Sequence, residues 1–225
     1  MPRNVKADID WANLLATTAN GNKRMTFREG EVIFAQGDNA DSAFYIEHGG
    51  VKKIYLSREG KERIVGVLKP GDFFGVGCLA GRQKRGTGAV AVTDSAVVRI
   101  EKRVMLQLLY DQAKLADLFI TFLIDQSHRY ESDLLDHLFN TSERRLARTL
   151  LLLSDLGESD GQQTTLPRIS QETLADIVGT TRSRINHFMN KFRHQGIIDY
   201  NGRIRVFNAR LQAVLDDATE DQRMN

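Results

Sequence analysis

The sequence predicts an α+β protein with an N-terminal β-roll of the jelly-roll type, one long helix and a C-terminal winged helix-turn-helix. Three observations lead to this prediction. Short apolar segments separated by turn residues fill the chain from residue 25 to about residue 105. A helical pattern without glycine or proline then runs to Phe139. Two short helices with good capping residues and a hairpin follow it. These changes of pattern place the expected domain boundaries at 1–110, 111–139 and 140–225.

Length and composition indicate a globular protein of two ordinary domains or one large one. The chain has 225 residues, of which 41% are apolar and 27% charged. Its start lacks the basic and then apolar stretch of a signal peptide. No apolar run approaches the roughly 20 residues of a membrane helix. We therefore expect a cytoplasmic protein with no membrane partner.

The residues that carry chemistry argue against an enzyme, a disulfide and a metal centre. Cys78 is the single cysteine of the chain, which excludes an internal disulfide and any four-cysteine cluster. The sequence contains no GxxxxGK[ST] phosphate loop, no HExxH zinc motif and no GxSxG nucleophile motif. We expect neither a catalytic function nor a bound metal.

The N-terminal part reads as short strands, each bounded by Gly, Asp or Asn. The segments are EVIFAQGD, SAFYIEHGGVKKIYLSREG, ERIVGVLKPGDFFG and GAVAVTDSAVVRIE. Their spacing is typical of an all-β barrel or sandwich.

One loop of this part is rich in glycine. Residues 71–88, GDFFGVGCLAGRQKRGTG, contain six of the 18 glycines together with Arg82, Lys84 and Arg85. Glycine lets a backbone reach positive φ and expose its N–H groups, which is how a loop can wrap an anion. The loop therefore predicts a cradle for a small anionic ligand.

The helical pattern between Lys114 and Phe139 is longer than one small domain needs. A helix of roughly 28 residues measures about 40 Å, so it either connects domains or pairs with a partner helix. Packing of its first half against the β-roll is one reading. The other is a dimer seam with alternating spacings of three and four, too short to establish a coiled coil by itself. The seam residues are Ile120, Leu123, Ser127, Tyr130 and Leu134.

The C-terminal part contains two short helices joined by a tight turn. They follow the helical segment TSERRLARTLLLLSDLG, which begins at a Ser or Thr cap, and the polar loop GESDGQQTT. Ser170 is a good N-cap for the first helix, Gly179 supplies a left-handed turn, and Thr181 caps the second helix. The second helix turns Ile185, Phe188, Met189 and Phe192 inward and Arg182, Ser183, Asn186, His187 and Asn190 outward. Caps and faces together predict a helix-turn-helix.

Positive charge is concentrated on this motif. Between residues 180 and 210, seven basic residues stand against one acid, Asp199, which leaves a local charge of +6. Such a stripe indicates a nucleic-acid partner, whereas a merely solvated face would interleave acids. The segment GIIDYNGRIRVF adds a hairpin around Asn-Gly, the favoured two-residue turn. Its Arg203 and Arg205 share one face, which we expect to meet phosphates.

These features together resemble the cyclic-AMP receptor protein/fumarate-nitrate regulator (CRP/FNR) superfamily. The resemblance covers the chain from Phe27 to Phe207 and includes the segments FREGEVIFAQGDNADSAFYIEHGGVK and LKPGDFFG. It implies a homodimeric transcription regulator with a cyclic-nucleotide-type sensor domain. Its helix 181–194 would read a palindromic operator in double-stranded DNA. RNA polymerase is a further candidate partner.

The resemblance also assigns DNA contacts. Arg182 stands where the family reads a base with arginine, and Thr181 stands where it meets a phosphate. Ser183 replaces the family's frequent Glu and His187 its later Arg, so the operator sequence does not transfer. The expected DNA-binding residues are Ser170, Thr180, Thr181, Arg182, Ser183, Arg184, Asn186, His187, Lys191, Arg203 and Arg205.

The same resemblance implies that the glycine-rich loop has lost most of its ligand groups. Nucleotide-binding members place a Glu on the ribose 2′-hydroxyl, then an Arg and a hydroxyl residue on the cyclic phosphate. Here Val76 stands at the Glu position and Arg85 is retained, but Gly86 follows it, with Thr87 one place later. With the two helix positions that meet adenine in the family, the expected pocket consists of Gly75, Val76, Gly77, Cys78, Arg85, Gly86, Thr87, Arg129 and Tyr130.

We therefore predict a regulator that requires no cofactor and binds cyclic AMP poorly, with a cyclic nucleotide or another small anionic ligand left open. One alternative is a regulator that depends on a cyclic nucleotide bound in a remodelled pocket. Another is a cyclic-nucleotide-binding module that acts through protein partners, against which the +6 segment argues. Thiol sensing by Cys78 is an alternative to its role as a small buried apolar side chain.

Overall fold

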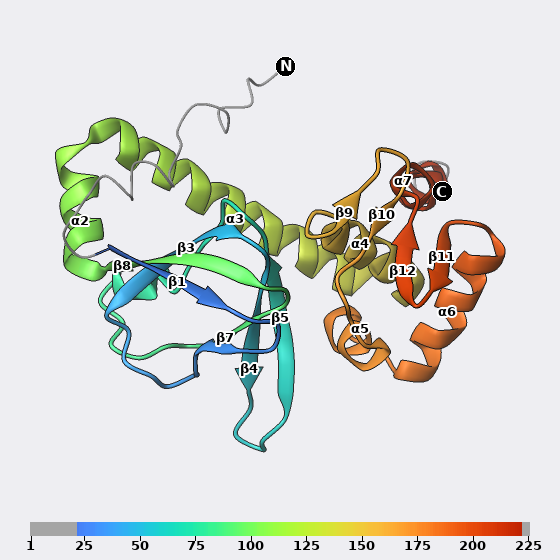
Figure 1. The fold of residues 1–225 in the computed structure, drawn as a ribbon, viewed down its shortest axis with the longest axis horizontal. Helices are drawn as coiled ribbons and strands as arrows, with labels where there is room; N and C mark the ends of the chain where they lie inside the picture. The colour runs from blue at the N-terminus through green and yellow to red at the C-terminus, as the bar shows by residue number, and fades with distance from the viewer. Residues whose placement is uncertain (1–21, 222–225) are drawn as a thin grey trace. The chain divides into compact units, whose positions relative to one another are not determined.

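The computed structural model describes residues 22–221 of the chain (Figure 1). The first 21 residues, on which the expectation about a signal peptide rests, lie outside the described residues, as do residues 222–225. The chain divides into two compact units. The first takes in the chain up to Gly60 and Leu68–Phe122, and the second takes in Lys61–Val67 and the chain from Leu123 onward. The three domain ranges expected from the sequence stay a prediction.

Short strands in two four-stranded sheets dominate the N-terminal part, as the sequence predicts. The strand orders are β1-β8-β3-β6 and β2-β7-β4-β5. Five of these neighbouring pairs are antiparallel: β1 with β8, β3 with β8, β3 with β6, β2 with β7 and β4 with β7. The elements are β1 (Asn22–Phe27), β2 (Val32–Phe34), β3 (Ser42–His48), β4 (Val51–Leu56), β5 (Glu62–Leu68), β6 (Phe73–Phe74), the 3₁₀ turn η2 (Val76–Cys78), β7 (Gly88–Ala91) and β8 (Ser95–Glu101).

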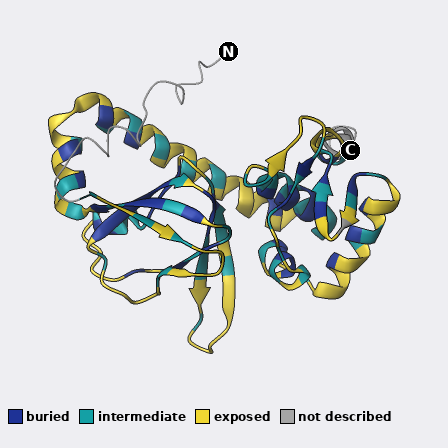
Figure 2. Cartoon of the chain, viewed as in Figure 1, coloured by how far each residue is buried: buried dark blue, intermediate teal, exposed yellow. Residues whose placement is uncertain are grey.

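Strand β3 is buried on both of its faces (Figure 2). On one face Phe44 contacts Phe74 and Phe34 at ring-centroid distances of 5.0 and 5.4 Å. On the other face Tyr45 contacts Phe73 at 4.9 Å. A strand covered on both sides reads as a continuous apolar run instead of an alternating one, which is why SAFYI contains no exposed residue.

Two helices follow the β-roll, α2 (Lys102–Asp111) and α3 (Ala113–Phe139). The first half of α3 packs in the core of the first unit. Leu115 and Phe119 are buried there, and Phe119 meets Phe73 edge-on at 5.4 Å. α3 has 27 residues, so its length agrees with the prediction. Across the described residues, none of the helices is long and apolar enough to cross a membrane.

The second unit surrounds a core of fully buried side chains that includes Leu146, Leu150, Leu174, Ile185 and Phe192. A four-stranded sheet of order β11-β12-β10-β9 packs beside its helices. Its elements are α4 (Ser142–Ser154), β9 (Glu158–Ser159), β10 (Thr164–Thr165), α5 (Gln171–Val178), α6 (Arg182–His194), β11 (Ile198–Asn201), β12 (Arg203–Val206) and α7 (Asn208–Asp221). This order of helices and hairpin confirms the predicted winged helix-turn-helix.

Two details of this unit differ from the sequence prediction. The segment expected to be a polar loop contains β9 and β10, because two-residue polar strands carry no periodic signal. The hairpin also reverses differently from the expected two-residue Asn-Gly turn. Tyr200 pairs with Ile204 and Asn201 with Arg203, so the reversal is centred on Gly202. Gly202 has a φ of +78°, and glycine reaches this region without a Cβ penalty.

Candidate functional site

Two capped helices and the turn between them form the helix-turn-helix. α5 begins at Ser170, whose Oγ accepts a hydrogen bond from the backbone N–H of Thr173 at 2.9 Å. It ends at Gly179, which has a left-handed φ of +69°. α6 begins at Thr181, whose Oγ1 accepts a hydrogen bond from the N–H of Arg184 at 3.3 Å. The predicted caps and glycine turn are therefore confirmed.

α6 has one buried face and one exposed face. Ile185 and Phe192 are fully buried and Met189 is nearly so, all three in the core of the second unit. The residues of this helix that are expected to meet DNA are exposed: Thr181, Arg182, Ser183, Arg184, Asn186, His187 and Lys191. Because the buried face fixes the rotation of the helix, these side chains point into solvent together.

Acidic residues from neighbouring helices accompany two cations of α6. Arg182 Nη1 lies 3.5 Å from Glu172 Oε1 of α5, and both side chains are largely exposed. Lys191 Nζ lies 2.8 Å from Glu143 Oε1 of α4. A count of charge between residues 180 and 210 misses both acids, because they lie earlier in the sequence. Only the packing of the helices brings them to this surface.

The wing contains a third pair of this kind. Arg205 Nη2 forms an ion pair with Asp199 Oδ2, and the two residues stand opposite each other in the hairpin register. Arg203 is exposed, whereas Arg205 is half-buried. Arg203 and Arg205 thus share a strand, but they do not share an environment.

The retained arginine of the glycine-rich loop contacts the protein itself. Arg85 is buried, and its Nη1 donates hydrogen bonds to the carbonyl oxygens of Ser42 at 2.7 Å and Gly75 at 2.9 Å. Its Nη2 donates to Ser42 Oγ at 3.0 Å. The guanidinium carbon lies 4.4 Å from the ring centroid of Phe34 and 5.3 Å from that of Phe44. Ser42, Phe34 and Phe44 are partners that the sequence pattern did not indicate.

The rest of this loop is partly packed into the unit. Val76, Gly77 and Cys78 form η2, and Cys78 is fully buried. Burial raises the pKa of the Cys78 thiol, which disfavours the reactive thiolate. Gly86 is exposed and Thr87 is half-buried, and no residue of the loop supplies a carboxylate at the position of Val76. The loop thus contains its glycines and Arg85, with Val76 and Gly86 at the two positions where the resemblance predicts the other ligand groups.

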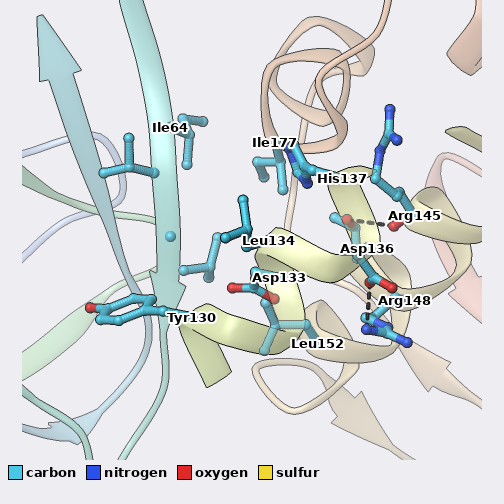
Figure 3. Close-up of a pocket in the computed structure, with 14 residues that line it drawn as sticks. Ile64, Tyr130, Asp133, Leu134, Asp136, His137, Arg145, Arg148, Leu152 and Ile177 are labelled. Atoms are coloured by element: carbon cyan, nitrogen blue, oxygen red, sulfur yellow. Dashed lines mark hydrogen bonds and ion pairs between the residues drawn. The ribbon is translucent and has the colours of Figure 1, made fainter. Parts of the chain in front are cut away.

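The two other expected pocket residues, Arg129 and Tyr130, belong to the second unit. Tyr130 lines a cavity of about 370 Å³ within that unit (Figure 3). Strand β5 and the helices α3, α4 and α5 supply its walls. Ile64, Leu134, Leu152 and Ile177 form much of the apolar part. Leu134, expected in the dimer seam, thus also faces this cavity.

Two aspartates lie on the polar side of the cavity, together with His137, Arg145, Arg148 and Thr149. Asp136 is buried, its Oδ2 lies 2.5 Å from Arg148 Nη1, and its Oδ1 accepts a hydrogen bond from Asn140 Nδ2 at 2.5 Å. Asp133 stands one turn earlier on α3. Desolvation at the cavity wall raises the pKa of Asp133, and the nearby Asp136 carboxylate raises it further. The described residues contain no group of three His, Cys, Asp or Glu side chains that could hold a metal ion.

We expect the replacement Asp133→Asn to stabilise the protein at neutral pH. The folded state raises the pKa of Asp133, so the folded state binds its proton more tightly than the unfolded chain does. The wild-type protein therefore loses stability relative to the variant as the pH rises through the folded pKa. Thermal unfolding from pH 4 to pH 8 should show the variant's advantage at high pH and its decline on acidification. Asp125→Asn, which removes the same charge from α3 outside the cavity, is the control. An advantage that grows on acidification would contradict the assignment.

Two family models match the regions that contain the glycine-rich loop and the helix-turn-helix. A cyclic nucleotide-binding domain matches residues 24–112. A Crp-like helix-turn-helix domain matches residues 144–211.

Curated proteins similar to the chain are transcriptional regulators. A CRP-like cAMP-activated global transcriptional regulator of Mycobacterium tuberculosis is 25% identical over 179 residues, which are 79% of this chain and 80% of that protein. The cAMP-activated global transcriptional regulator CRP of Escherichia coli O6:H1 is 28% identical over 182 residues, 77% of this chain and 84% of that protein.

Solved structures show the same fold. FixK2 from Bradyrhizobium japonicum has a TM-score of 0.73 at 22% identity, covering 85% of this chain and 96% of that chain. A CRP-family transcriptional regulator from Thermus thermophilus, TTHB099, has a TM-score of 0.70 at 25% identity, covering 84% and 95%. With both domain matches in the same chain, these relatives show that the protein belongs to the CRP/FNR superfamily of transcription regulators, with a cyclic nucleotide-binding domain followed by a DNA-binding helix-turn-helix.

Proposed function

We propose that this regulator binds a palindromic operator as a homodimer through α6, and that its sensor domain has lost most of its affinity for cyclic nucleotides. The observation that carries the first part is α6 itself. Its apolar face is buried in the core of the second unit, while its polar residues form one exposed face that begins at a capped N-terminus. In helix-turn-helix proteins the N-terminal residues of the second helix contact base edges in the major groove.

Individual contacts follow from position and chemistry. Arg182 is the first residue of α6, and an arginine fork matches the O6 and N7 acceptors of guanine. Thr181 and the exposed Arg203 of the wing are suited to phosphates. Arg205 and Lys191 can reach phosphates only by loosening their ion pairs with acids. The remaining proposed contacts are Ser170, Thr180, Ser183, Arg184, Asn186 and His187.

The exposed apolar side chains of α3 support the dimer. The exposed fractions of Ile120, Leu123 and Leu134 are 54%, 38% and 60%. Ile124, Leu135 and Leu138 are also exposed on this helix, at 52%, 54% and 65%. Water-exposed side chains of this size are stabilised when a second helix covers them. A second copy of α3 would place two α6 helices about one DNA turn, or about 34 Å, apart.

The missing ligand groups correspond to a large loss of affinity for cyclic AMP. A carboxylate on a ribose hydroxyl contributes about 1.5–3 kcal/mol, and a neutral hydroxyl on phosphate about 0.5–1.5 kcal/mol. Val76 and Gly86 remove both, which corresponds to roughly 30- to 2,000-fold in affinity. Arg85, the remaining group, already donates hydrogen bonds to Ser42 and Gly75. From Val76, Gly86 and Arg85 together we expect DNA binding that does not depend on cyclic AMP.

A cyclic-nucleotide-dependent regulator with a remodelled pocket is the second candidate. The names of the relatives from Mycobacterium tuberculosis and Escherichia coli, both cAMP-activated regulators, favour it. Thr87 supports it as well, because a shift of the loop by one residue would bring its hydroxyl to the position that Gly86 leaves without one. A module that acts only through protein partners would show no mobility shift with any duplex.

We expect Arg182→Ala to weaken binding by about 1–3 kcal/mol per half-site and to relax preference at one base pair, because a bidentate base contact carries sequence information. Arg203→Ala should weaken binding to all sequences alike and reduce the salt slope by about 0.9, because one phosphate contact is lost. The duplex is the one that the wild-type protein selects from a randomised library, and fluorescence anisotropy gives the affinities. Equal loss with selected and random DNA in Arg182→Ala would refute its role.

Leu123→Asp should convert the protein from a dimer to a monomer at micromolar concentration, because a carboxylate cannot be buried unpaired between two helices. Sedimentation velocity measures the change. Leu106→Asp on α2, where Leu106 is similarly exposed at 42%, is the control and should remain a dimer. A wild-type monomer that binds a single half-site tightly would rule out the proposed dimer.

Calorimetry should detect no micromolar binding of cyclic AMP, and the affinity for the selected duplex should not change when the nucleotide is added. The reason is the loss of contacts at Val76 and Gly86. The double variant Val76→Glu with Gly86→Ser serves as a positive control and should gain affinity for cyclic AMP. Micromolar binding by the wild-type protein, with tighter DNA binding in its presence, would establish the second candidate instead.

A further inference from the structure

The carboxylate that accompanies Arg182 comes from another helix. The first turn of α6 contains no acidic residue. Glu172, in the first turn of α5, reaches across the helix-turn-helix so that its Oε1 lies 3.5 Å from Arg182 Nη1. The side chains of Arg182 and Glu172 are 69% and 73% exposed. The pair therefore lies on the surface that α6 presents, and not in the core.

An acid at this place changes what Arg182 can bind. A guanidinium has five N–H donors, so it can keep a carboxylate on one edge and offer another edge to a base. The negative charge of Glu172 repels phosphates nearby, which penalises a backbone contact by Arg182. A base edge carries no net charge and escapes this penalty. The pair also restricts the rotamers of a long flexible side chain before DNA is bound.

We propose that Glu172 is a specificity-determining residue, which positions Arg182 for a base edge and disfavours its contact with phosphates. The proposal rests on the base-reading role of Arg182 proposed above. In this role Glu172 acts through its ion pair with Arg182. The exposed pair is weak by itself, because water and salt screen it. Its effect is therefore expected on discrimination between sequences and not on the stability of the fold.

The test compares Glu172→Gln, Arg182→Ala, the double variant and the wild type, all as full-length protein. Each binds three duplexes: the selected operator, the operator with the Arg182-dependent base pair exchanged in both halves, and random DNA. Salt is varied from about 50 to 200 mM. Glu158→Gln removes the same charge from β9, at the edge of the sheet opposite β11, and serves as the matched control. Thermal unfolding verifies that each variant is folded.

In Glu172→Gln we expect discrimination at that base pair to fall by up to about fivefold, the range of an exposed ion pair. Binding to random DNA should tighten, and its salt slope should steepen by about 0.9 because Arg182 becomes free to contact a phosphate. In the Arg182→Ala background the same replacement should leave all three unchanged: the discrimination, the affinity for random DNA and its salt slope. Glu158→Gln should leave discrimination unchanged.

Three outcomes would overturn the proposal. Unchanged discrimination in Glu172→Gln would show that the acid does not position Arg182. An equal gain of affinity with and without Arg182 would show that Glu172 acts only as a distant charge. If Arg182→Ala itself relaxes no base pair, the base-reading role fails first, and the role of Glu172 fails with it. The single variants therefore separate failure of the proposed function from failure of this inference.

Discussion

The burial of one face of α6 is the interaction on which the exposed polar surface of the helix-turn-helix depends. Ile185 and Phe192 have no exposed surface and Met189 has very little. Each such side chain contributes about 1.5–3 kcal/mol when it leaves water, so the rotation of the helix about its axis is strongly fixed. A rotation by one residue, about 100°, would bury charged groups and expose this face. The direction of Arg182 is therefore set by side chains on the opposite side of the helix.

The cations of this surface have more acidic neighbours than a count of charge along the sequence indicates. Arg182, Lys191 and Arg205 each have an acidic neighbour within ion-pair distance. Exposed pairs of this kind contribute little to stability and are screened by salt, so phosphates can compete for these cations. A phosphate contact that breaks such an ion pair costs the free energy of the pair, however. A base contact that leaves the pair intact does not have this cost. In the role proposed for Glu172, an acid within a basic surface lowers indiscriminate binding more than it lowers specific binding.

The parts of the site that were predictable from the sequence are those governed by local chemistry. Ser170, Gly179 and Thr181 cap or turn helices through contacts within a few residues, and such contacts follow from residue type and spacing. The pairing of Asp199 with Arg205 is a property of hairpin register, but the expected turn length would have placed it wrongly. Glu172 and Glu143 come from other helices. Their positions beside α6 depend on how α4, α5 and α6 pack, which a charge count does not contain.

In the first unit, the contacts of the glycine-rich loop with distant segments were likewise not predictable from the sequence. Its glycines and Arg85 indicate an anion cradle, yet the fold places Ser42 of β3 beside the arginine, 43 positions away in the chain. Arg85 Nη1 uses both of its N–H donors on the carbonyl oxygens of Ser42 and Gly75, whereas the buried Nε has no hydrogen-bond partner among the residues that the structure describes. An anion that takes the donors of Nη1 leaves these carbonyl oxygens without a donor, and each buried carbonyl in that state costs about 1–3 kcal/mol. An anion that contacts the Nε and Nη2 side avoids this cost, because a guanidinium has five N–H donors. The contacts of Arg85 therefore restrict the edge from which it can hold an anion, independently of the missing ribose and hydroxyl groups.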